Sequence, residues 1–196
     1  MDLSQFEWIN TPNDFEVSED RLTIQTDEQT DFWQRTHYGF RNDNAHAFVR
    51  RIPEVEFSFS VHTRFKPAAM YDQCGVVIYQ DSENWFKGSI EYDNPAYSRL
   101  GSVVTNGGFS DWATTDIRAG EEIRMRYRLS RRGMDFLLEN AMDGNEFRQM
   151  RIFHLGAARG AVRAGVYACS PLRSSINAVF TGFALTPCMW PAYNGH

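Results

Sequence analysis

The sequence lacks the features that most quickly assign a chain to a function class. Its 196 residues contain no apolar run of 18, the length that a membrane-spanning helix needs. They contain no P-loop, dinucleotide-binding fingerprint or GxSxG motif. There is also no basic block, since the net charge is −5 and charges of both signs are spread along the chain. We therefore expect no membrane span and no nucleic-acid partner.

Cysteine is scarce, and its spacing gives no framework for disulfides or metal. Cys74, Cys169 and Cys188 form no CxxC pair, and the histidines show no paired ligand spacing, so we expect no metal site and no cofactor. The N-terminal stretch MDLSQFEWIN is acidic and has no apolar segment, unlike a secretory signal. These observations favour reduced thiols and a cytoplasmic protein. Cys74 and Cys169 lie in apolar runs and are expected to be small buried hydrophobes.

Helical periodicity is missing as well, and only Thr114–Glu122 could hold a turn of helix. Elsewhere, short alternating segments are separated by turn residues, a pattern typical of a β-sandwich. The Asp143-Gly144 turn predicts a hairpin with Met134–Glu139 and Phe147–Ile152 as its arms. The predicted strands are Arg21–Thr26, Ala45–Arg51, Val55–Phe65, Gln73–Gln80, Trp85–Asp93, Ser98–Thr105, Glu121–Ser130, Met134–Glu139, Gln149–Phe153, Val162–Ala168 and Ala178–Leu185.

The length suits one sandwich domain, and no linker, repeat or low-complexity tract divides the chain. Aromatic residues make up 14% of the sequence, a content that suits strands. We predict a single all-β domain of two antiparallel sheets over residues 1–186. Residues 187–196 contain two prolines and no alternation, and we expect them to form a surface tail.

The predicted strand Trp85–Asp93 has two unlike faces, because successive side chains of a strand point to opposite sides. One set is mostly apolar and should face the core. The other set puts a tryptophan, a lysine and carboxylates in line, which is unusual for a plain surface strand and marks a candidate concave binding face. The core-facing set is Phe86, Gly88, Ile90 and Tyr92, and the opposite set is Trp85, Lys87, Ser89, Glu91 and Asp93.

The same parity gives core and outer sets in two further strands. In Val55–Phe65 the core set is Val55, Phe57, Phe59, Val61 and Phe65. In Glu121–Ser130 the apolar set alternates with arginines. These arginines can pair across strands with Glu54, Glu56 or Glu139. Alternatively they form a site for an anionic ligand, since guanidinium groups match carboxylate and phosphate. The arginines are Arg124, Arg126 and Arg128.

Several segments together resemble the family of unknown function that includes the regulation-of-enolase protein. The ordered set is specific, although no single motif in it is. The resemblance implies a concanavalin A-like lectin/glucanase jelly roll of two antiparallel sheets, and it implies no reaction. Related domains include laminarinase-type glucanases and accessory domains of β-xylosidases, which use the concave sheet face for sugar. The segments are Asp31-Phe32-Trp33 with Tyr38-Gly39, Tyr71 to Gly75, Asn84 to Glu91, Ser102 to Thr105, Ser110-Asp111-Trp112, and Ser170-Pro171.

The residues in these segments have the composition of a carbohydrate groove. Aromatic faces stack on sugar rings, while carboxylates, amides and lysine hydrogen-bond to hydroxyl groups. We predict a carbohydrate or small polar ligand on the concave face. The alternative is that the tryptophans are half-buried packing anchors and that Asp31 and Asp111 cap turns. The candidate ligand-binding residues are Asp31, Trp33, His37, Tyr71, Gln73, Trp85, Lys87, Glu91, Asp111 and Trp112.

A glycoside hydrolase is the second hypothesis, with Glu91 and Asp93 as the carboxyl pair. They are two residues apart on one strand face, roughly 6.5–7 Å between Cα atoms, which such chemistry permits. Lys87 is expected to pair with Glu91 and lower its pKa, which disfavours a general acid and shifts the weight to binding. A regulatory protein-interaction module is the third hypothesis, and edge strands could pair two copies into a homodimer.

Overall fold

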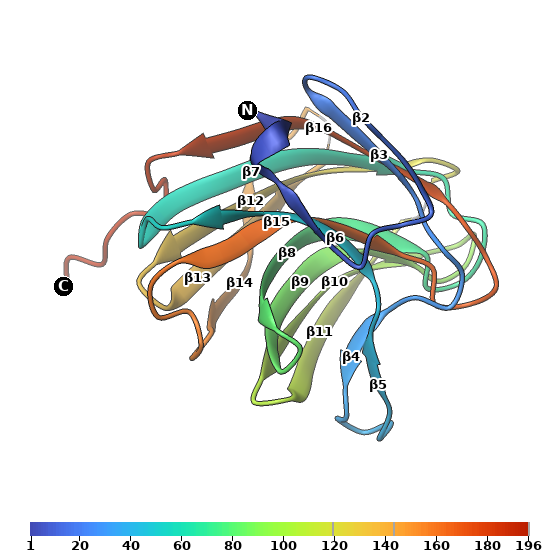
Figure 1. Cartoon of the computed structure of the whole chain (residues 1–196), viewed down its shortest axis with the longest axis horizontal. Coiled ribbons are helices and arrows are strands. Elements are labelled where there is room, and N and C mark those ends of the chain that lie inside the picture. The colour runs from blue at the N-terminus through green and yellow to red at the C-terminus, as the bar shows by residue number, and fades with distance from the viewer. Residues whose placement is uncertain (119, 143, 196) are drawn as a thin grey trace.

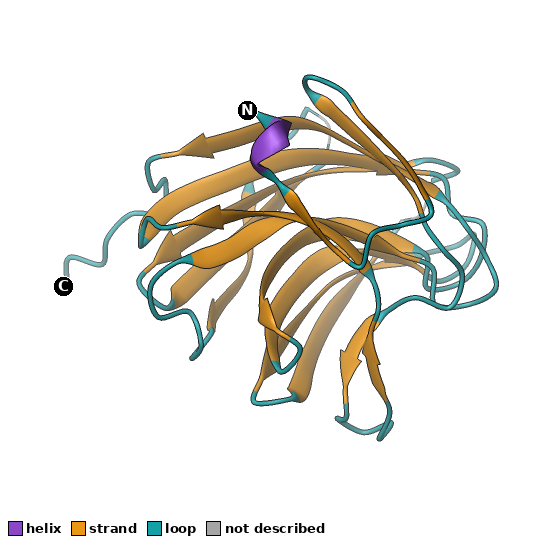
Figure 2. Cartoon of the chain, viewed as in Figure 1, coloured by secondary structure: helices purple, strands orange, loops and turns teal. Residues whose placement is uncertain are grey.

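The computed structural model describes residues 1–118, 120–142 and 144–195. Strands cover most of these ranges, and a 3-10 turn, η1 (Leu3–Gln5), lies near the N-terminus (Figure 2). The strands form two seven-stranded antiparallel sheets that stack on each other (Figure 1). This confirms the predicted all-β sandwich. Among the described residues no helix is long and apolar enough to cross a membrane.

The first sheet, sheet A, carries the predicted polar strand in its interior. Sheet B covers its inner face, and a two-stranded hairpin, β4 (Phe32–Gln34) and β5 (Arg41–Asp43), stands apart from both. In spatial order, sheet A is β1 (Glu7–Ile9), β6 (His46–Ile52), β15 (Val162–Cys169), β8 (Gln73–Asp81), β9 (Asn84–Tyr92), β10 (Ser98–Asn106) and β11 (Phe109–Ile117). Sheet B is β14 (Arg148–His154), β13 (Asp135–Ala141), β12 (Ile123–Arg132), β7 (Glu56–Phe65), β16 (Asn177–Thr186), β3 (Arg21–Gln25) and β2 (Asp14–Val17).

The main core fills the space between the sheets, and strand parity explains its composition. Phe86 and Ile90 of β9 point inward and join Phe59 of β7 and Tyr127 of β12 in one buried cluster. Fully burying each such side chain contributes about 1.5–3 kcal/mol. The predicted inner faces of these strands are therefore confirmed, with one exception. Val55 is 52% exposed, because it lies in the turn before β7, where its carbonyl accepts from the Gly133 N–H.

Two local predictions are wrong or fall outside the described residues. The segment Thr114–Glu122, which could have held a turn of helix, instead begins as strand, since β11 runs to Ile117 and pairs with β10 along its whole length; Ala119 lies outside the described residues. Cross-strand pairing thus outweighs the weak local preference of that segment. The arms β13 and β14 of the predicted hairpin do pair, but Asp143 in its turn lies outside the described residues.

The β4–β5 hairpin projects beyond the outer face of sheet A (Figure 1). Neither strand was predicted, because each has only three residues. A second buried cluster lies beneath the hairpin, where Phe32 packs 5.7 Å from Tyr79 and 5.5 Å from Trp85, measured between ring centroids. This apolar contact fixes the hairpin on the sheet and makes it a wall of the candidate site.

The C-terminal segment after β16 packs along sheet B. The Met189 N–H donates to Ser58 Oγ at 2.8 Å, and Arg132 Nε donates to the Trp190 carbonyl at 2.9 Å. These two contacts hold the first part of the predicted surface tail, and residues 191–195 are exposed.

Candidate functional site

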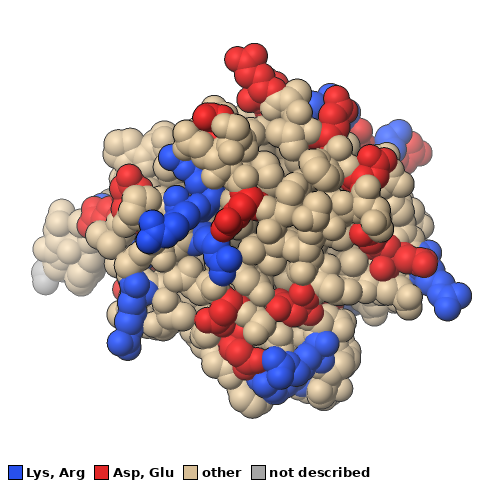
Figure 3. Space-filling view, in the orientation of Figure 1, with Lys and Arg blue, Asp and Glu red and all other residues tan. Residues whose placement is uncertain are grey.

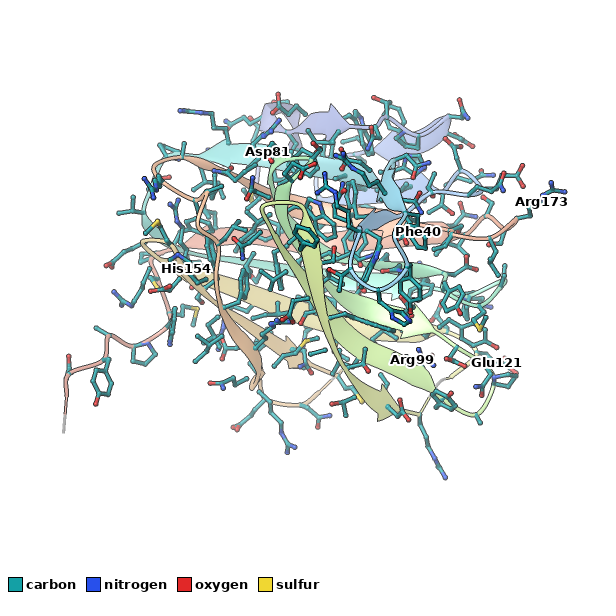
Figure 4. All side chains as sticks on the ribbon, turned by 90° about the horizontal axis from the view of Figure 1, so that it is seen from below. Phe40, Asp81, Arg99, Glu121, His154 and Arg173 are labelled. Carbon is teal, nitrogen blue, oxygen red and sulfur yellow. The ribbon has the colours of Figure 1, made fainter. Side chains whose placement is uncertain are left out.

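A cavity of about 320 Å³ lies on the outer face of sheet A, and we call it the concave cavity. Strands β8 and β9 form its floor, β10 and β11 form one wall, and the β4–β5 hairpin forms the other. Figure 4 looks toward this side, with Phe40 on the hairpin and Arg99 on the sheet. The volume lies within the range of small-molecule pockets. The lining includes Asp31, Trp33, Tyr38, Phe40, Asn42, Tyr71, Gln73, Lys87, Ser89, Glu91, Arg99, Gly101, Trp112, Pro171 and Leu172.

Lys87 places a buried positive charge at the base of the cavity. Its side chain is 6% exposed, and Nζ donates to Asp31 Oδ1 at 2.8 Å. Burial opposes the ammonium charge, but the Asp31 carboxylate and other neighbouring acidic groups outweigh it and raise the pKa of Lys87. The expected Lys87–Glu91 pair is therefore wrong, because Asp31 reaches the ammonium from the segment before β4.

Glu91 is the carboxyl group with the most altered acidity in the cavity. Burial raises its pKa to about 7, and Asp31 acts in the same direction, while Lys87, Arg99 and Gln73 act in the opposite one. The expectation of a lowered pKa is wrong, because desolvation exceeds the attraction of Lys87, whose charge is already matched by Asp31. Glu91 therefore changes its protonation state near neutral pH.

A hydrogen-bonded network holds the floor in place around Glu91. Gln73 Nε2 donates to Glu91 Oε2 at 3.1 Å, and the buried Tyr167 hydroxyl lies 2.7 Å from both Gln73 Oε1 and Ser89 Oγ. The tyrosine thus fixes the orientation of the Gln73 amide. The floor of the cavity is therefore a fixed set of amide, hydroxyl and carboxyl groups.

The hairpin contributes a stack of aromatic side chains to one wall. Trp33 is 8% exposed, and its indole N–H donates to the Thr36 carbonyl at 3.1 Å, so it is chiefly a packing residue. Tyr38 lies 5.4 Å from Trp33 and 5.5 Å from Phe40, measured between ring centroids. Tyr38 is 54% exposed and Phe40 46% exposed, so these two rings present apolar surface to an incoming ligand.

Trp112 forms the aromatic part of the opposite wall. Its ring is 37% exposed and meets Trp33 edge to face at 6.4 Å between centroids. The Arg99 guanidinium lies 5.7 Å from the centre of the Trp112 ring. Gly101 makes room for the indole, because a Cβ at that position would lie 3.1 Å from Trp112 Nε1. The glycine therefore positions Trp112 beside the cavity.

Tyr71 lies at the end of the cavity in a strained backbone conformation. Its φ is +74°, a region that costs a non-glycine residue roughly 1–3 kcal/mol. Its carbonyl accepts from Gln73 Nε2 at 3.1 Å. The next residue, Asp72, is fully buried and accepts from Ser174 Oγ at 2.8 Å, which ties the loop before β8 to the loop after β15. The surrounding structure thus holds Tyr71 at the cavity.

Seven of the ten candidate ligand-binding residues line the concave cavity, and three do not. Trp85 lies on the predicted face but is fully buried under Phe32 of the hairpin. His37 is exposed in the hairpin turn with φ +63°. Asp111 points to the face of β11 opposite Trp112 and pairs with Arg151 at 2.6 Å. The seven are Asp31, Trp33, Tyr71, Gln73, Lys87, Glu91 and Trp112.

The proposed catalytic pair is not brought together in the cavity. Asp93 follows the end of β9, pairs with Arg99 at 2.6 Å and does not line the cavity. Glu91 therefore faces the cavity without Asp93. In the part of the chain that the structure describes, no group of three or more His, Cys, Asp or Glu residues is arranged to hold a metal ion.

Sequence reasoning missed several residues of the walls. Arg99 lies directly opposite Glu91 in the β9–β10 register, and Gly101 lies opposite Ser89. The turn residues Asp93-Asn94-Pro95 separate the two predicted strands, and a hairpin register built on that turn is the signal that could have found both. Tyr38 and Phe40 gave no such signal, because their place depends on how the hairpin folds over the sheet.

Comparison with known proteins identifies the family. A family model described as a protein of unknown function, DUF1349, matches residues 8–188. The chain belongs to the DUF1349 family. It is 29% identical over 185 residues to Regulation of enolase protein 1 of Saccharomyces cerevisiae, which covers 94% of this chain and 91% of that protein. The family resemblance read from the sequence is confirmed.

Solved structures share the architecture of this DUF1349 chain. The crystal structure of a functionally unknown protein from Saccharomyces cerevisiae superposes with a TM-score of 0.88 and 27% identity, over 97% of this chain and 100% of that chain. The GH43 protein BlXynB of Bacillus licheniformis has a TM-score of 0.72 at 15% identity, over 93% of this chain and 37% of its own. The carbohydrate binding module CBM66 of Bacillus subtilis has a TM-score of 0.58 at 9% identity, over 91% and 94%. The last two likenesses show the fold alone.

Proposed function

We propose that the chain binds a carbohydrate, or a similarly hydroxylated polar ligand, in the concave cavity. The observation that carries the proposal is the convergence of exposed aromatic faces and hydrogen-bonding groups in one cavity. Tyr38, Phe40 and Trp112 offer apolar surface, while Glu91 and Arg99 offer charged, hydrogen-bonding groups in the same cavity. An apolar lining with a few fixed polar groups is the usual composition of a ligand site.

The structural neighbours support this proposal at the level of architecture. A carbohydrate binding module and a GH43 protein share the sandwich fold. Fold alone does not transfer function, so the argument rests on the cavity. The cytoplasmic location and the homodimer remain predictions from the sequence. The visible face carries both acidic and basic side chains (Figure 3), and the expected absence of a nucleic-acid partner also remains a prediction from the sequence.

The binding proposal is tested by screening the protein against a glycan array and titrating each hit calorimetrically. Replacing Trp112 by alanine should raise Kd about fivefold, since stacking on an aromatic ring is worth roughly 1 kcal/mol. The matched control is Trp190→Ala in the C-terminal segment, which should leave Kd unchanged. If no glycan binds, or if Trp112→Ala binds as tightly as the control, the proposed site is wrong.

A glycoside hydrolase is the second candidate, and one observation favours it. A carboxyl group whose pKa is raised to about 7 in a cavity is suited to act as a general acid. The hydrolase would need a second carboxyl group other than Asp93, and Asp31 is the other one that lines the cavity. Incubation with a panel of aryl glycosides and β-glucans decides between the two, because a binding protein releases no product.

A further inference from the structure

The outer face of sheet B, on the opposite side of the molecule from the concave cavity, carries rows of arginines. Two of them are matched by carboxylates. Arg128 Nε donates to Glu139 at 2.6 Å, and Arg132 pairs with Glu56 at 2.8 Å. This half of the face is therefore charge-balanced, as the cross-strand interpretation of the arginine row predicts.

The other half of the face is not balanced. Arg124 of β12 lies directly opposite Arg64 of β7 in the strand register. Like charges in that position destabilise a sheet unless a counter-charge is present. Both guanidinium groups share the single carboxylate of Glu122, with Arg64 at 3.4 Å and Arg124 at 2.5 Å. Two cations thus compete for one anion.

A third arginine completes a hollow of about 290 Å³, which we call the basic hollow and which is lined by Arg21, His62, Arg64, Arg124, Val179 and Thr181, among others. Arg21 comes from β3, and its recorded side-chain contact is Nε to Thr23 Oγ1 at 3.4 Å. Among the described residues, neither Arg21 nor Glu16, which lies opposite Thr23 on β2, forms an ion pair within 4 Å. The hollow therefore carries excess positive charge on a chain whose net charge is −5.

An irregularity in the neighbouring strand shapes the floor of the basic hollow. The register of β16 against β7 shifts between Thr181 and Ala184, where Gly182 has φ +64°. A Cβ at Gly182 would lie 3.4 Å from three atoms of the His62 ring, so the imidazole packs against this glycine. β-Bulges are frequent next to binding sites because they redirect side chains. Here the bulge directs Phe183 into the core and leaves the hollow beside His62.

We propose that the basic hollow binds a phosphate or sulfate group, with Arg64, Arg124 and Arg21 donating to its oxygens. Guanidinium groups bind tetrahedral oxyanions through paired N–H donors, and an anion between the opposed arginines would relieve their repulsion. The side chains of Arg64 and Arg124 are 42% and 53% exposed, so a ligand can reach them. This site is independent of the concave cavity.

The test is calorimetric or NMR titration with inorganic pyrophosphate and, in a separate arm, inorganic sulfate, both at constant ionic strength set with chloride. We expect saturable binding with Kd of about 1 mM or tighter. Arg64→Ala and Arg124→Ala should each weaken binding at least tenfold. Arg64→Lys keeps the charge but loses the paired donors, so its Kd should lie between that of the alanine variants and that of the unaltered protein.

Two controls separate a built site from general attraction. Arg173→Ala removes the same charge from an exposed loop residue that points away from the body (Figure 4), and it should bind as the unaltered protein does. Trp112→Ala should also bind normally, which separates this site from the concave cavity. The proposal would be overturned if neither anion bound saturably. It would also be overturned if Arg173→Ala and Arg64→Ala lost anion affinity equally. Binding of one anion alone identifies the group that the hollow accepts.

Discussion

At the residue scale, the environment of a side chain decides its role more than its type does. Lys87 and Glu91 share one strand face. Lys87 forms an ion pair with Asp31, whereas burial raises the pKa of Glu91. Trp85 and Trp112 are both tryptophans of the same sheet, yet only Trp112 is partly exposed beside the cavity. Composition indicated candidate residues, and burial decided which of them face the cavity.

The raised pKa of Glu91 predicts a stability that falls with rising pH. The ordinary pKa is 4.5 and the folded-state value is about 7, so the folded protein binds more protons than the unfolded chain between these values. The contribution of Glu91 to the free energy of unfolding should therefore decrease from about pH 4.5 to 7. Glu91→Gln removes this dependence, and relative to the unaltered protein its stability should rise by about 2 kcal/mol between pH 5 and 8.

Urea unfolding of both proteins at pH 5 and pH 8 measures that difference. Glu121→Gln is the control, since this carboxylate is exposed on the surface, and it should leave the pH dependence of the unaltered protein in place. A pH dependence that persists unchanged in Glu91→Gln would contradict the assignment of the group.

At the element scale, a buried arginine joins three of the connections between strands. Arg131 at the end of β12 is fully buried and donates to four backbone carbonyls rather than to a carboxylate. These carbonyls belong to the turn before β7, the β12–β13 turn and the β14–β15 loop. Burial lowers the pKa of Arg131 below its ordinary value, but the guanidinium remains charged.

Replacing Arg131 by methionine should destabilise the protein by about 3 kcal/mol or more, because several buried carbonyls lose their donors at once. The neighbouring Arg132 offers a matched control. It pairs with Glu56 and donates to one carbonyl, that of Trp190, both near the surface, so Arg132→Met should cost only about 1 kcal/mol. Unfolding in guanidinium chloride measures the free energy of unfolding of both variants. An equal decrease in the two would show that Arg131 does not join the three loops.

At the scale of the whole molecule, both buried clusters rest on the same sheet. The main core lies between sheets A and B, and the second lies between sheet A and the β4–β5 hairpin. Phe86 and Trp85 are successive residues of β9 that enter different clusters. Loss of sheet A therefore removes support from both clusters together.

We expect a single cooperative unfolding transition. Far-UV circular dichroism follows the sheets, and the fluorescence of the five tryptophans includes the signal of the second cluster, from Trp33 and Trp85. The two transitions should coincide in urea. A fluorescence change at lower urea than the dichroism change would show that the hairpin and its cluster unfold separately.

The sequence by itself determined the sandwich and the polar face of β9. Alternation has a period of two along a strand, so side chains such as Phe86 and Lys87 are assigned to opposite faces without knowledge of their neighbours. The same rule revealed most of the cavity floor and the outer arginines. It could not assign Trp85, because the residues that cover it come from a hairpin fifty residues earlier in the chain.

Only the tertiary structure decided which charges meet. The partner of Lys87 is Asp31 rather than Glu91, and the partner of Asp93 is Arg99. Ion pairing depends on distances between segments that are remote in sequence, and the pKa of Glu91 depends on its burial, a property of the packed chain. Strand periodicity is local and can be read from the sequence, whereas desolvation and charge pairing arise when the strands pack together.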